Sequence, residues 1–256
     1  MKFSDLDWHQ RYLLQSTWTR SLRQYLFERV GIDSLGKILD VGCGTGVLEA
    51  ELIQITRAAV FGVDVDASAL LVAAQYTPQT TFMRADGHYL PFPVSTFDLV
   101  MCHFTLMWVE SPALFLSEMI RVGRPGGSVL AIAEPDYGGR IDFPLALEKL
   151  GAWQAQSLRA QGADPMLGRR LRSLFKQAGF SRIETGVLGG QWSMEALSSN
   201  RSAEWEVLEY DLAHLSISQV DASLLDDLKS IDAEAYRNGE RVLFVPTFYA
   251  WGKIER

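Results

Sequence analysis

Three glycines alternate with other residues directly after a short apolar run, and this loop constrains the fold more than any other feature of the sequence. They are Gly42, Gly44 and Gly46, within "ILDVGCGTGVLEAELI". The run 37–41 predicts a buried strand, and apolar spacing over 47–56 predicts a helix. Glycine lets the backbone adopt a positive φ and approach a ligand closely. A plain turn needs one glycine, so three in five residues favour a ligand-binding turn.

The residues around the loop narrow the choice of ligand. A dinucleotide-binding loop reads G-x-G-x-x-G, whereas the spacing here is G-x-G-x-G. A triphosphate-binding loop ends in Gly-Lys-Ser/Thr, but Val47 follows Gly46. Asp40 stands two residues before the first glycine, where its charge repels phosphate and attracts an ammonium group. The loop therefore favours a ligand that carries an ammonium group over one that carries phosphate.

Predicted strands and helices alternate through the first half of the chain. After a helix at 5–30, strands are predicted at 37–41, 59–66, 80–86, 96–104 and 124–135, with helices between them at 47–56, 67–76 and 111–122. This alternation implies right-handed crossovers and a parallel sheet covered by helices on both faces. The later part of the chain predicts a loop at 136–144, helices at 145–162 and 168–180, a strand at 181–190, helical segments within 194–238 and a last strand at 241–255.

The bulk composition excludes several classes of protein. The 256 residues are 48% hydrophobic and 21% charged, which supplies enough apolar material for one sizeable core. A net charge of −7 without a long basic run argues against nucleic acid as a partner. Cys43 and Cys102 have no metal-ligand spacing, so we expect no metal site and a cytoplasmic location. The apolar runs are too short to cross a bilayer, so we expect no membrane association.

The segment "ILDVGCGTG" resembles motif I of the class I S-adenosylmethionine-dependent methyltransferases, in particular a small-molecule, type 11-like methyltransferase domain. The resemblance continues through "FGVDVDASALLVAA", "MRADGHYLPFPVSTFDLVMCHFTLMWV" and "EMIRVGRPGGSVLAIAEP". It covers residues 37–135 in ordered succession, and more weakly "GRRLRSLFKQAGF" and the last strand. Together with the seven predicted strands, it implies an α/β, Rossmann-like, doubly wound and mostly parallel seven-stranded sheet, with an antiparallel last strand and helical cap elements.

The resemblance implies a role for each matching position around the loop. The three loop glycines would lie against the methionine part and the ribose of S-adenosylmethionine. Asp40 would hold the methionine ammonium group, directly or through water. Asp64, at the end of the second predicted strand, would accept hydrogen bonds from the ribose hydroxyls, because a carboxylate offers two acceptor oxygens to a vicinal diol.

The resemblance also implies contacts to the adenine and to the methionine end. Val65 would flank the adenine, and Asp86, with Gly87 beside it, would accept from the adenine amino group. Cys102 and His103, at the end of the fourth predicted strand, would face the methionine end with backbone groups. Asp64 and Asp86 have a plainer interpretation as turn acids, which the residues alone leave open.

Methyl transfer from a sulfonium is an in-line displacement, so alignment in a dry site matters more than a conspicuous catalytic residue. We predict His103 as the catalytic residue, against the alternative that it is a packed, hydrogen-bonded histidine. The acceptor-site candidates lie near the expected methyl position or on the N-terminal helix. They are Trp8, Tyr12, Glu134 and Tyr137.

We expect residues 1–256 to form a single methyltransferase domain. Its parts are an N-terminal helical lid at 1–30, a cofactor-binding core at 37–135, a helical region at 136–180 and a helical insert at 194–238 that caps the acceptor site. An aromatic-rich cap favours a small-molecule acceptor. No Asn/Asp-Pro-Pro-aromatic motif follows the fourth strand, where "CHFTLM" stands, which argues against a nucleic-acid base as the acceptor.

The sequence thus predicts an S-adenosylmethionine-dependent methyltransferase that acts on a small molecule, as a monomer or homodimer. Three alternatives stay open. One is a protein that binds S-adenosylmethionine without catalysis, and another is methylation of a protein or RNA. The third is an NAD(P)-dependent Rossmann oxidoreductase, against which the glycine spacing, Asp86 and the lack of a Tyr-x-x-x-Lys pair argue.

Overall fold

The computed structural model describes residues 8–188, 194–214 and 222–255. These residues group into two compact units. The sheet unit comprises 8–134, 167–188 and 248–255, and the helical unit comprises the described residues of 135–247 outside 167–188. Each unit is described by itself below.

The sheet unit is built on one seven-stranded sheet in the order β3-β2-β1-β4-β5-β9-β7. Its strands are β1 (Lys37–Val41), β2 (Ala59–Asp64), β3 (Thr81–Arg84), β4 (Phe97–Cys102), β5 (Gly123–Pro135), β7 (Ile183–Leu188) and β9 (Thr247–Lys253). Strands β1 to β5 pair in parallel, and one strand of the sheet is antiparallel. The strand order reverses between β1 and β4, which is where an open parallel sheet binds its ligand.

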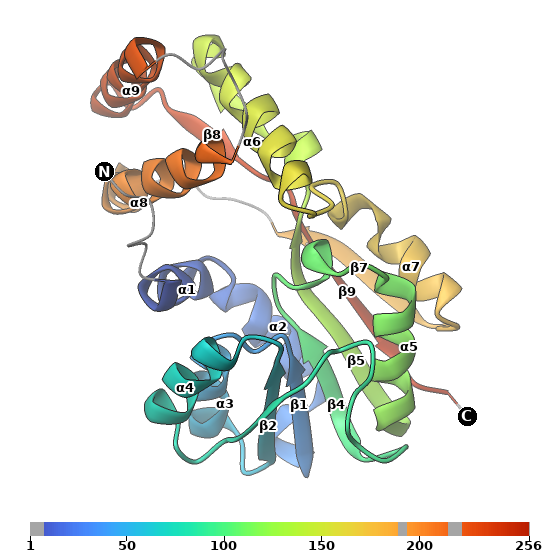
Figure 1. Cartoon of the computed structure of the whole chain (residues 1–256). Helices are drawn as coiled ribbons and strands as arrows, with labels where there is room; N and C mark the ends of the chain where they lie inside the picture. Colours follow the sequence, from blue (N-terminus) through green and yellow to red (C-terminus); the bar gives the residue numbers. More distant parts are fainter. Residues whose placement is uncertain (1–7, 189–193, 215–221, 256) are drawn as a thin grey trace. The chain divides into compact units, whose positions relative to one another are not determined.

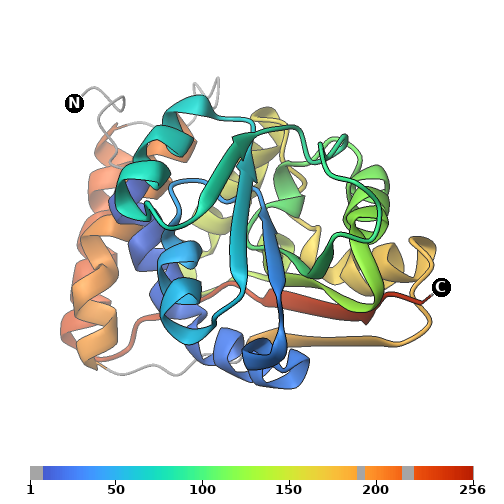
Figure 2. The ribbon, with the colours of Figure 1, turned by 90° about the horizontal axis from the view of Figure 1, so that it is seen from below.

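Helices cover this sheet (Figures 1 and 2). They are α1 (Trp8–Trp18), α2 (Arg20–Val30), α3 (Val47–Ile55), α4 (Ala67–Tyr76), α5 (Pro112–Val122) and α7 (Leu171–Gln177). Helices α3 and α4 pack beside β2, and α5 packs beside β4. The core that fixes the glycine loop consists of fully or almost fully buried apolar residues of α2, α3 and the central strands. They include Leu26, Ile38, Leu52, Leu99, Met101, Leu130 and Ile132.

The helical unit contains α6 (Glu148–Ala160), α8 (Met194–Ala213), α9 (Ala222–Arg237) and a two-stranded antiparallel sheet of β6 (Ile141–Phe143) and β8 (Val242–Phe244). Its core packs together apolar side chains of the three helices and of the turn just before α6. They are Leu147, Leu150, Trp205, Leu208, Leu212 and Leu228.

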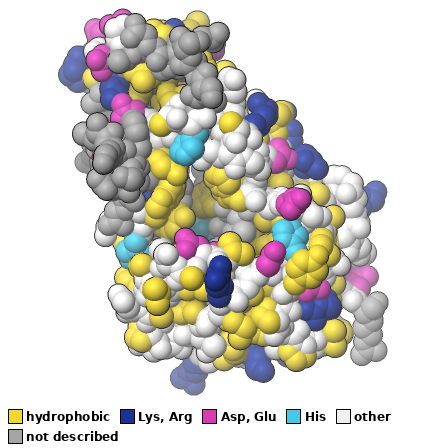
Figure 3. Space-filling view, in the orientation of Figure 1, with side chains coloured by type: hydrophobic (Ala, Val, Ile, Leu, Met, Phe, Trp, Pro, Cys, Tyr) yellow, Lys and Arg dark blue, Asp and Glu magenta, His cyan; other side chains and the backbone are white. Residues whose placement is uncertain are grey.

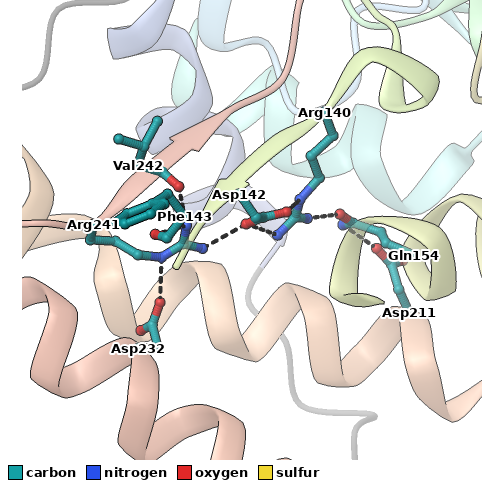
Figure 4. A network of polar contacts seen from close by, with 8 residues as sticks. All are labelled: Arg140, Asp142, Phe143, Gln154, Asp211, Asp232, Arg241 and Val242. Atoms are coloured by element: carbon teal, nitrogen blue, oxygen red, sulfur yellow. Dashed lines mark hydrogen bonds and ion pairs between the residues drawn. The ribbon is translucent and has the colours of Figure 1, made fainter. Parts of the chain in front are cut away.

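A buried polar network joins the elements of the helical unit (Figure 4). Arg241 donates to Asp232 of α9 at 2.7 Å and to Asp142 of β6 at 2.8 Å. Arg140 also pairs with Asp142, at 2.6 Å, and donates to Gln154 of α6. The side chains of both arginines and of Asp142 are less than a tenth exposed. Water therefore stabilises their charges little, and the ion pairs between them must do so instead.

The structure confirms the predicted fold class and differs from the predicted elements in four places. The helix predicted at 5–30 is two helices within the described residues, because Thr19 has non-helical backbone angles. The segment 136–144, predicted as a loop, contains β6. The last strand is divided by Val245 and Pro246 into β8 and β9. The region 136–180 divides after Met166 between the two units.

None of the helices in the described parts of the chain is both long enough and apolar enough to cross a membrane.

Candidate functional site

The glycine loop adopts the backbone that its sequence predicted. Gly42, Gly44 and Gly46 have φ values of +85°, +53° and +79°. The N–H groups of Gly42 and Cys43 both donate to the carbonyl oxygen of Val63 on β2, at 2.8 and 3.1 Å. This shared acceptor turns the chain sharply at the end of β1, and the absence of a side chain at Gly42 and Gly44 lets Thr105 and Tyr12 approach the loop backbone closely.

Asp64, at the end of β2, holds the loop from the neighbouring strand. One carboxylate oxygen accepts from the Gly44 N–H at 2.8 Å, and the other accepts from the Asp66 N–H at 2.9 Å. Each oxygen retains a further acceptor lone pair. The next residue, Val65, is 59% exposed, so an apolar side chain stands open to solvent beside this carboxylate.

The loop after β4 packs tightly against the glycine loop. A Cβ built on Gly42 would lie 2.5 Å from Cγ2 of Thr105, so only glycine fits there. Phe104, just before it, has a φ of +55°, a conformation that a bulky residue adopts only when its surroundings impose it.

Glu134, at the end of β5, imposes that conformation. Its carboxylate accepts from the backbone N–H groups of Thr105, Leu106 and Met107 at 3.0, 2.9 and 3.1 Å. Glu134 is fully buried, and burial raises the pKa of its carboxyl group to about 7, against the lowering effect of these donors. The Glu134 carboxylate therefore supports the loop after β4, while its contact with an acceptor stays a prediction.

Asp86 follows β3 and has a partner that the sequence analysis missed. Its Oδ1 accepts from the backbone N–H of His88 at 2.9 Å and lies 2.6 Å from Nδ1 of the same residue. Nε2 of His88 accepts from the Ser111 N–H at 3.2 Å, so the proton of a neutral His88 ring is on Nδ1. The hydrogen bond from the backbone N–H of His88 is the main cause that lowers the pKa of Asp86. The hydrogen bond from Nδ1 lowers it further and orients the carboxylate.

Gly87 is required by packing. A Cβ at this position would overlap the ring of Phe115, which belongs to α5 and is 4% exposed. The absence of a side chain lets the turn after β3 close over α5, and this closure fixes the backbone on either side of Asp86.

His103 has a hydrogen-bonded setting at the end of β4. Its Nε2 lies 2.9 Å from Oγ1 of Thr19, which is fully buried and also accepts from Arg23. Burial, with a smaller effect from the Arg23 guanidinium, lowers the pKa of His103 to about 3. The preceding residue, Cys102, is fully buried, and burial raises the pKa of its thiol well above the ordinary value. Neither side chain is prepared to act as a strong base or nucleophile.

Helix α1 lies against the glycine loop. Nδ1 of His9 is 2.9 Å from Oγ1 of Thr45. A Cβ at Gly44 would lie 3.2 Å from the ring of Tyr12, whose centroid is 5.8 Å from that of Trp8. The structure thus brings Trp8 and Tyr12 to the loop, while Tyr137, in the turn Tyr137–Gly139, belongs to the helical unit.

Asp40 is 2% exposed and faces Glu49 of α3, which is fully buried. Oδ1 of Asp40 and both carboxylate oxygens of Glu49 receive no hydrogen bond from the described residues. Glu49 is therefore a second acid of the site that sequence reasoning missed. Glu49 lies in the first turn of α3, where an acid is common at a helix start, so the sequence gave no signal of a ligand-binding role.

Comparison with known proteins identifies the sheet unit. Residues 39–131 match the family model described as "Methyltransferase domain". A trans-aconitate 2-methyltransferase from Azoarcus sp. (strain BH72) is 35% identical over 149 residues, which cover 58% of this chain and 58% of the relative. The chain spans about half of the length of several curated relatives that it matches.

Two solved structures share the fold. The [4+2]-cyclase SpnF superimposes with a TM-score of 0.63 at 17% identity, over 92% of this chain and 81% of SpnF. Phosphoethanolamine N-methyltransferase 2 of Haemonchus contortus, solved with S-adenosyl-L-methionine, superimposes with a TM-score of 0.62 at 20% identity, over 93% of this chain and 53% of that one. At such identities the likeness shows the fold alone.

The matched residues, the strand order and the glycine loop agree. The methyltransferase-domain match over residues 39–131 confirms the resemblance to S-adenosylmethionine-dependent methyltransferases that the sequence predicted.

Proposed function

We propose that this protein is an S-adenosylmethionine-dependent methyltransferase with a small-molecule acceptor. The observation that carries the proposal is the positive-φ backbone of the glycine loop, with Asp64 and Asp86 at or just after the ends of the next two strands of the sheet. Parallel strands place these groups along one edge. Along this edge the glycine loop comes first, then Asp64 for the ribose hydroxyls, then Asp86 for the adenine. This is the order of the corresponding parts in the proposed cofactor.

The chain's own residues fit this cofactor. Asp64 keeps acceptor capacity for the ribose hydroxyls while it holds Gly44. Val65 offers an exposed apolar surface to the adenine. Asp86, oriented by His88, accepts from the adenine amino group. Asp40 retains an unpaired buried oxygen for the ammonium group.

The proposed mechanism relies on alignment rather than on proton abstraction. Bound S-adenosylmethionine supplies an electrophilic methyl group. Glu134 fixes the loop of Thr105 against Gly42, and α1 with Tyr12 covers the glycine loop. These contacts hold the reacting groups in place and exclude water, effects that together lower the barrier substantially. Because the pKa of His103 is about 3, its imidazole is a weak base, and the proposed mechanism does not use it to deprotonate the acceptor.

The surface is consistent with a small acceptor. Lys and Arg side chains are scattered among hydrophobic and uncharged ones on the face shown in Figure 3, and the net charge is −7. A phosphate backbone would need a gathered basic surface.

Calorimetric titration tests the cofactor, and a panel of acceptors tests the reaction. We expect S-adenosylmethionine and S-adenosylhomocysteine to bind and NAD to produce no heat above dilution. Amines, carboxylic acids and thiols are then incubated with methyl-labelled cofactor. NAD binding without S-adenosylmethionine binding would establish the oxidoreductase alternative instead.

We also expect Asp64→Ala to weaken binding of S-adenosylhomocysteine by about 1–3 kcal/mol, because charge-assisted hydrogen bonds to the ribose and to the loop are lost. Asp66→Ala is the matched control. Asp66 accepts from the Ser68 N–H as the N-cap of α4, so its loss lowers stability by about 1 kcal/mol and leaves the affinity unchanged. Equal affinities for both folded variants would remove Asp64 from the site.

His103 is expected to stay neutral throughout the neutral range. The folded protein binds this proton only below about pH 3, whereas the unfolded chain binds it below about 6.5. Between about pH 6.5 and about pH 3 the unfolded chain binds this proton and the folded chain does not, so lowering the pH through this range reduces the free energy of unfolding. The stabilisation from the neutral ring is fully present only above about pH 6.5. An NMR titration of the imidazole signals, assigned with His103→Gln, measures this pKa.

The same variant tests the role of His103 in transfer. With a productive acceptor and saturating cofactor, we expect His103→Gln to lower the rate by less than about tenfold, whereas removal of a general base costs about 10²–10⁴. His214→Gln, in the helical unit and exposed, is the control. A loss above a hundredfold with intact cofactor affinity would restore His103 as the catalytic residue.

The second candidate is a protein that binds S-adenosylmethionine without transferring its methyl group. Two observations favour this candidate over an oxidoreductase. The pKa of His103 is about 3, and the Glu134 carboxylate accepts from three backbone N–H groups, so neither side chain is suited to transfer a proton. Cofactor binding together with a silent acceptor panel would support it.

A further inference from the structure

Two buried carboxyl groups face one another below the glycine loop. Asp40 comes from β1 and is 2% exposed, and Glu49 comes from α3 and is fully buried. Among the described residues, Oδ1 of Asp40 and both carboxylate oxygens of Glu49 form no hydrogen bond of normal geometry, and burial acts on both acids. Two ionised carboxylates in contact would repel one another with nothing to compensate them. A proton between them converts this repulsion into a hydrogen bond.

Charged and titratable groups around the pair come from several elements, and the acids among them disfavour its ionised form. Asp64 of β2 adds a further negative charge, and Cys43 in the loop is a neutral thiol whose pKa burial and the neighbouring acids raise. Helix α1, which packs against α3, carries Arg11, whose guanidinium lies 4.7 Å from the centre of the Trp18 ring. Burial is the largest cause that raises the pKa of both carboxyl groups, that of Asp40 to about 7. The pair therefore titrates as a unit, and its first proton leaves near neutral pH.

We propose that Glu49 is a positioning residue for the amino-acid end of the cofactor, because it shares one proton with Asp40 and thereby presents a single negative charge to the ligand's ammonium group. The inference rests on the proposed function. When the ammonium group docks, its N–H groups donate to the pair, which favours the singly charged form. The O–H bond of a doubly protonated pair breaks, and that proton leaves to solvent.

This arrangement couples binding to pH. Below about pH 7 the pair is largely neutral, so each bound ligand must displace a proton, and affinity rises by up to about tenfold per pH unit. Above that value the pair already carries its charge, and affinity becomes independent of pH until the ligand's own ammonium group loses its proton.

The test is calorimetric titration of the full chain with S-adenosylhomocysteine, in buffers of different ionisation enthalpy. In the wild type we expect close to one proton released per ligand at about pH 6, and almost none at about pH 8. Adenosine, which has no amino-acid end, serves as the second probe. It is expected to bind without release of a proton at either pH.

Glu49→Gln identifies the residue responsible. The glutamine amide donates to Asp40, so Asp40 is ionised well below pH 7 and both the proton release and the pH dependence of affinity disappear. Glu148→Gln, exposed on α6, is the matched control and is expected to behave as the wild type. If Glu49→Gln fails to fold, Asp40→Asn gives the same prediction from the other side of the pair.

The outcomes separate the two proposals. Binding of S-adenosylhomocysteine without release of a proton at about pH 6 overturns the role of Glu49 and leaves the proposed function intact. Equal proton release by Glu49→Gln and the wild type also overturns it. Absence of any binding overturns the proposed function, and the inference with it.

Discussion

Arg241→Met is expected to destabilise the helical unit by about 3–5 kcal/mol, the cost of removing one charged member of a buried ion-pair network. Arg241 is 4% exposed and bridges Asp142 of β6 to Asp232 of α9. Without it, Asp232 keeps the indole N–H of Trp205 at 2.8 Å, and Asp142 keeps Arg140. Neither of these two groups replaces the cation beside Asp232, because Trp205 is neutral and Arg140 pairs with Asp142.

Urea denaturation followed by circular dichroism measures this effect. Arg237→Met removes an exposed arginine from the end of α9 and is expected to change stability by less than about 0.5 kcal/mol. The double variant Arg241→Met, Asp232→Asn removes one charge of each sign and retains an acceptor for Trp205, so it should recover part of the loss. If Arg241→Met and Arg237→Met unfold at the same urea concentration, the network contributes no stability.

The sheet unit could be predicted because its signals are local. The glycine loop, the apolar strands and the helix start at Ser111-Pro112 each depend on residues adjacent in sequence. By contrast, β6 has three residues, and its register pairs Ile141 with Phe244 and Phe143 with Val242. No local pattern in "IDF" indicates a partner about a hundred residues away, so the segment was predicted as a loop.

The acids of the site show a second limit of sequence reasoning. Asp64 and Asp86 stand at strand ends, where topology alone brings them to one edge. The environment of Glu134 depends on the backbone of a loop almost thirty residues earlier, and that of Glu49 on which face of α3 meets β1. A carboxyl group that caps backbone N–H groups and one that contacts a ligand look the same in a sequence. Only burial and hydrogen-bond partners distinguish them.

The break between α1 and α2 has a similar cause. Apolar spacing runs through 5–30 without a proline or glycine, so the pattern predicts one helix. The chain turns at Thr19 because its hydroxyl lies 2.9 Å from Nε2 of His103 and also accepts from Arg23. This tertiary contact sets where α1 begins to cross the glycine loop, and hence which of its aromatic residues reach the site.

Gly42→Ala tests the loop directly, and its matched control lies elsewhere in the same sheet. Gly42 has a φ of +85° and Gly126 has one of +79°, so alanine at either position pays a similar backbone strain of about 1–2 kcal/mol. A Cβ at Gly126 meets nothing within 4 Å, whereas one at Gly42 lies 2.5 Å from Cγ2 and 3.1 Å from Cβ of Thr105. Only the first substitution therefore adds overpacking, at about 1–3 kcal/mol.

The strained loop of Gly42→Ala cannot relax cheaply, because Thr105 is anchored through its N–H to Glu134 and through its hydroxyl to the carbonyl oxygen of His103. We expect this variant to lose about 2–5 kcal/mol of stability and at least about tenfold in affinity for S-adenosylhomocysteine, because the displaced backbone is the surface that we propose meets the ligand. Gly126→Ala should keep wild-type affinity. Adding Thr105→Ala to Gly42→Ala removes Cγ2 and Oγ1, and should restore part of both losses. If it restores neither, the approach of the two loops is not what makes glycine necessary at position 42.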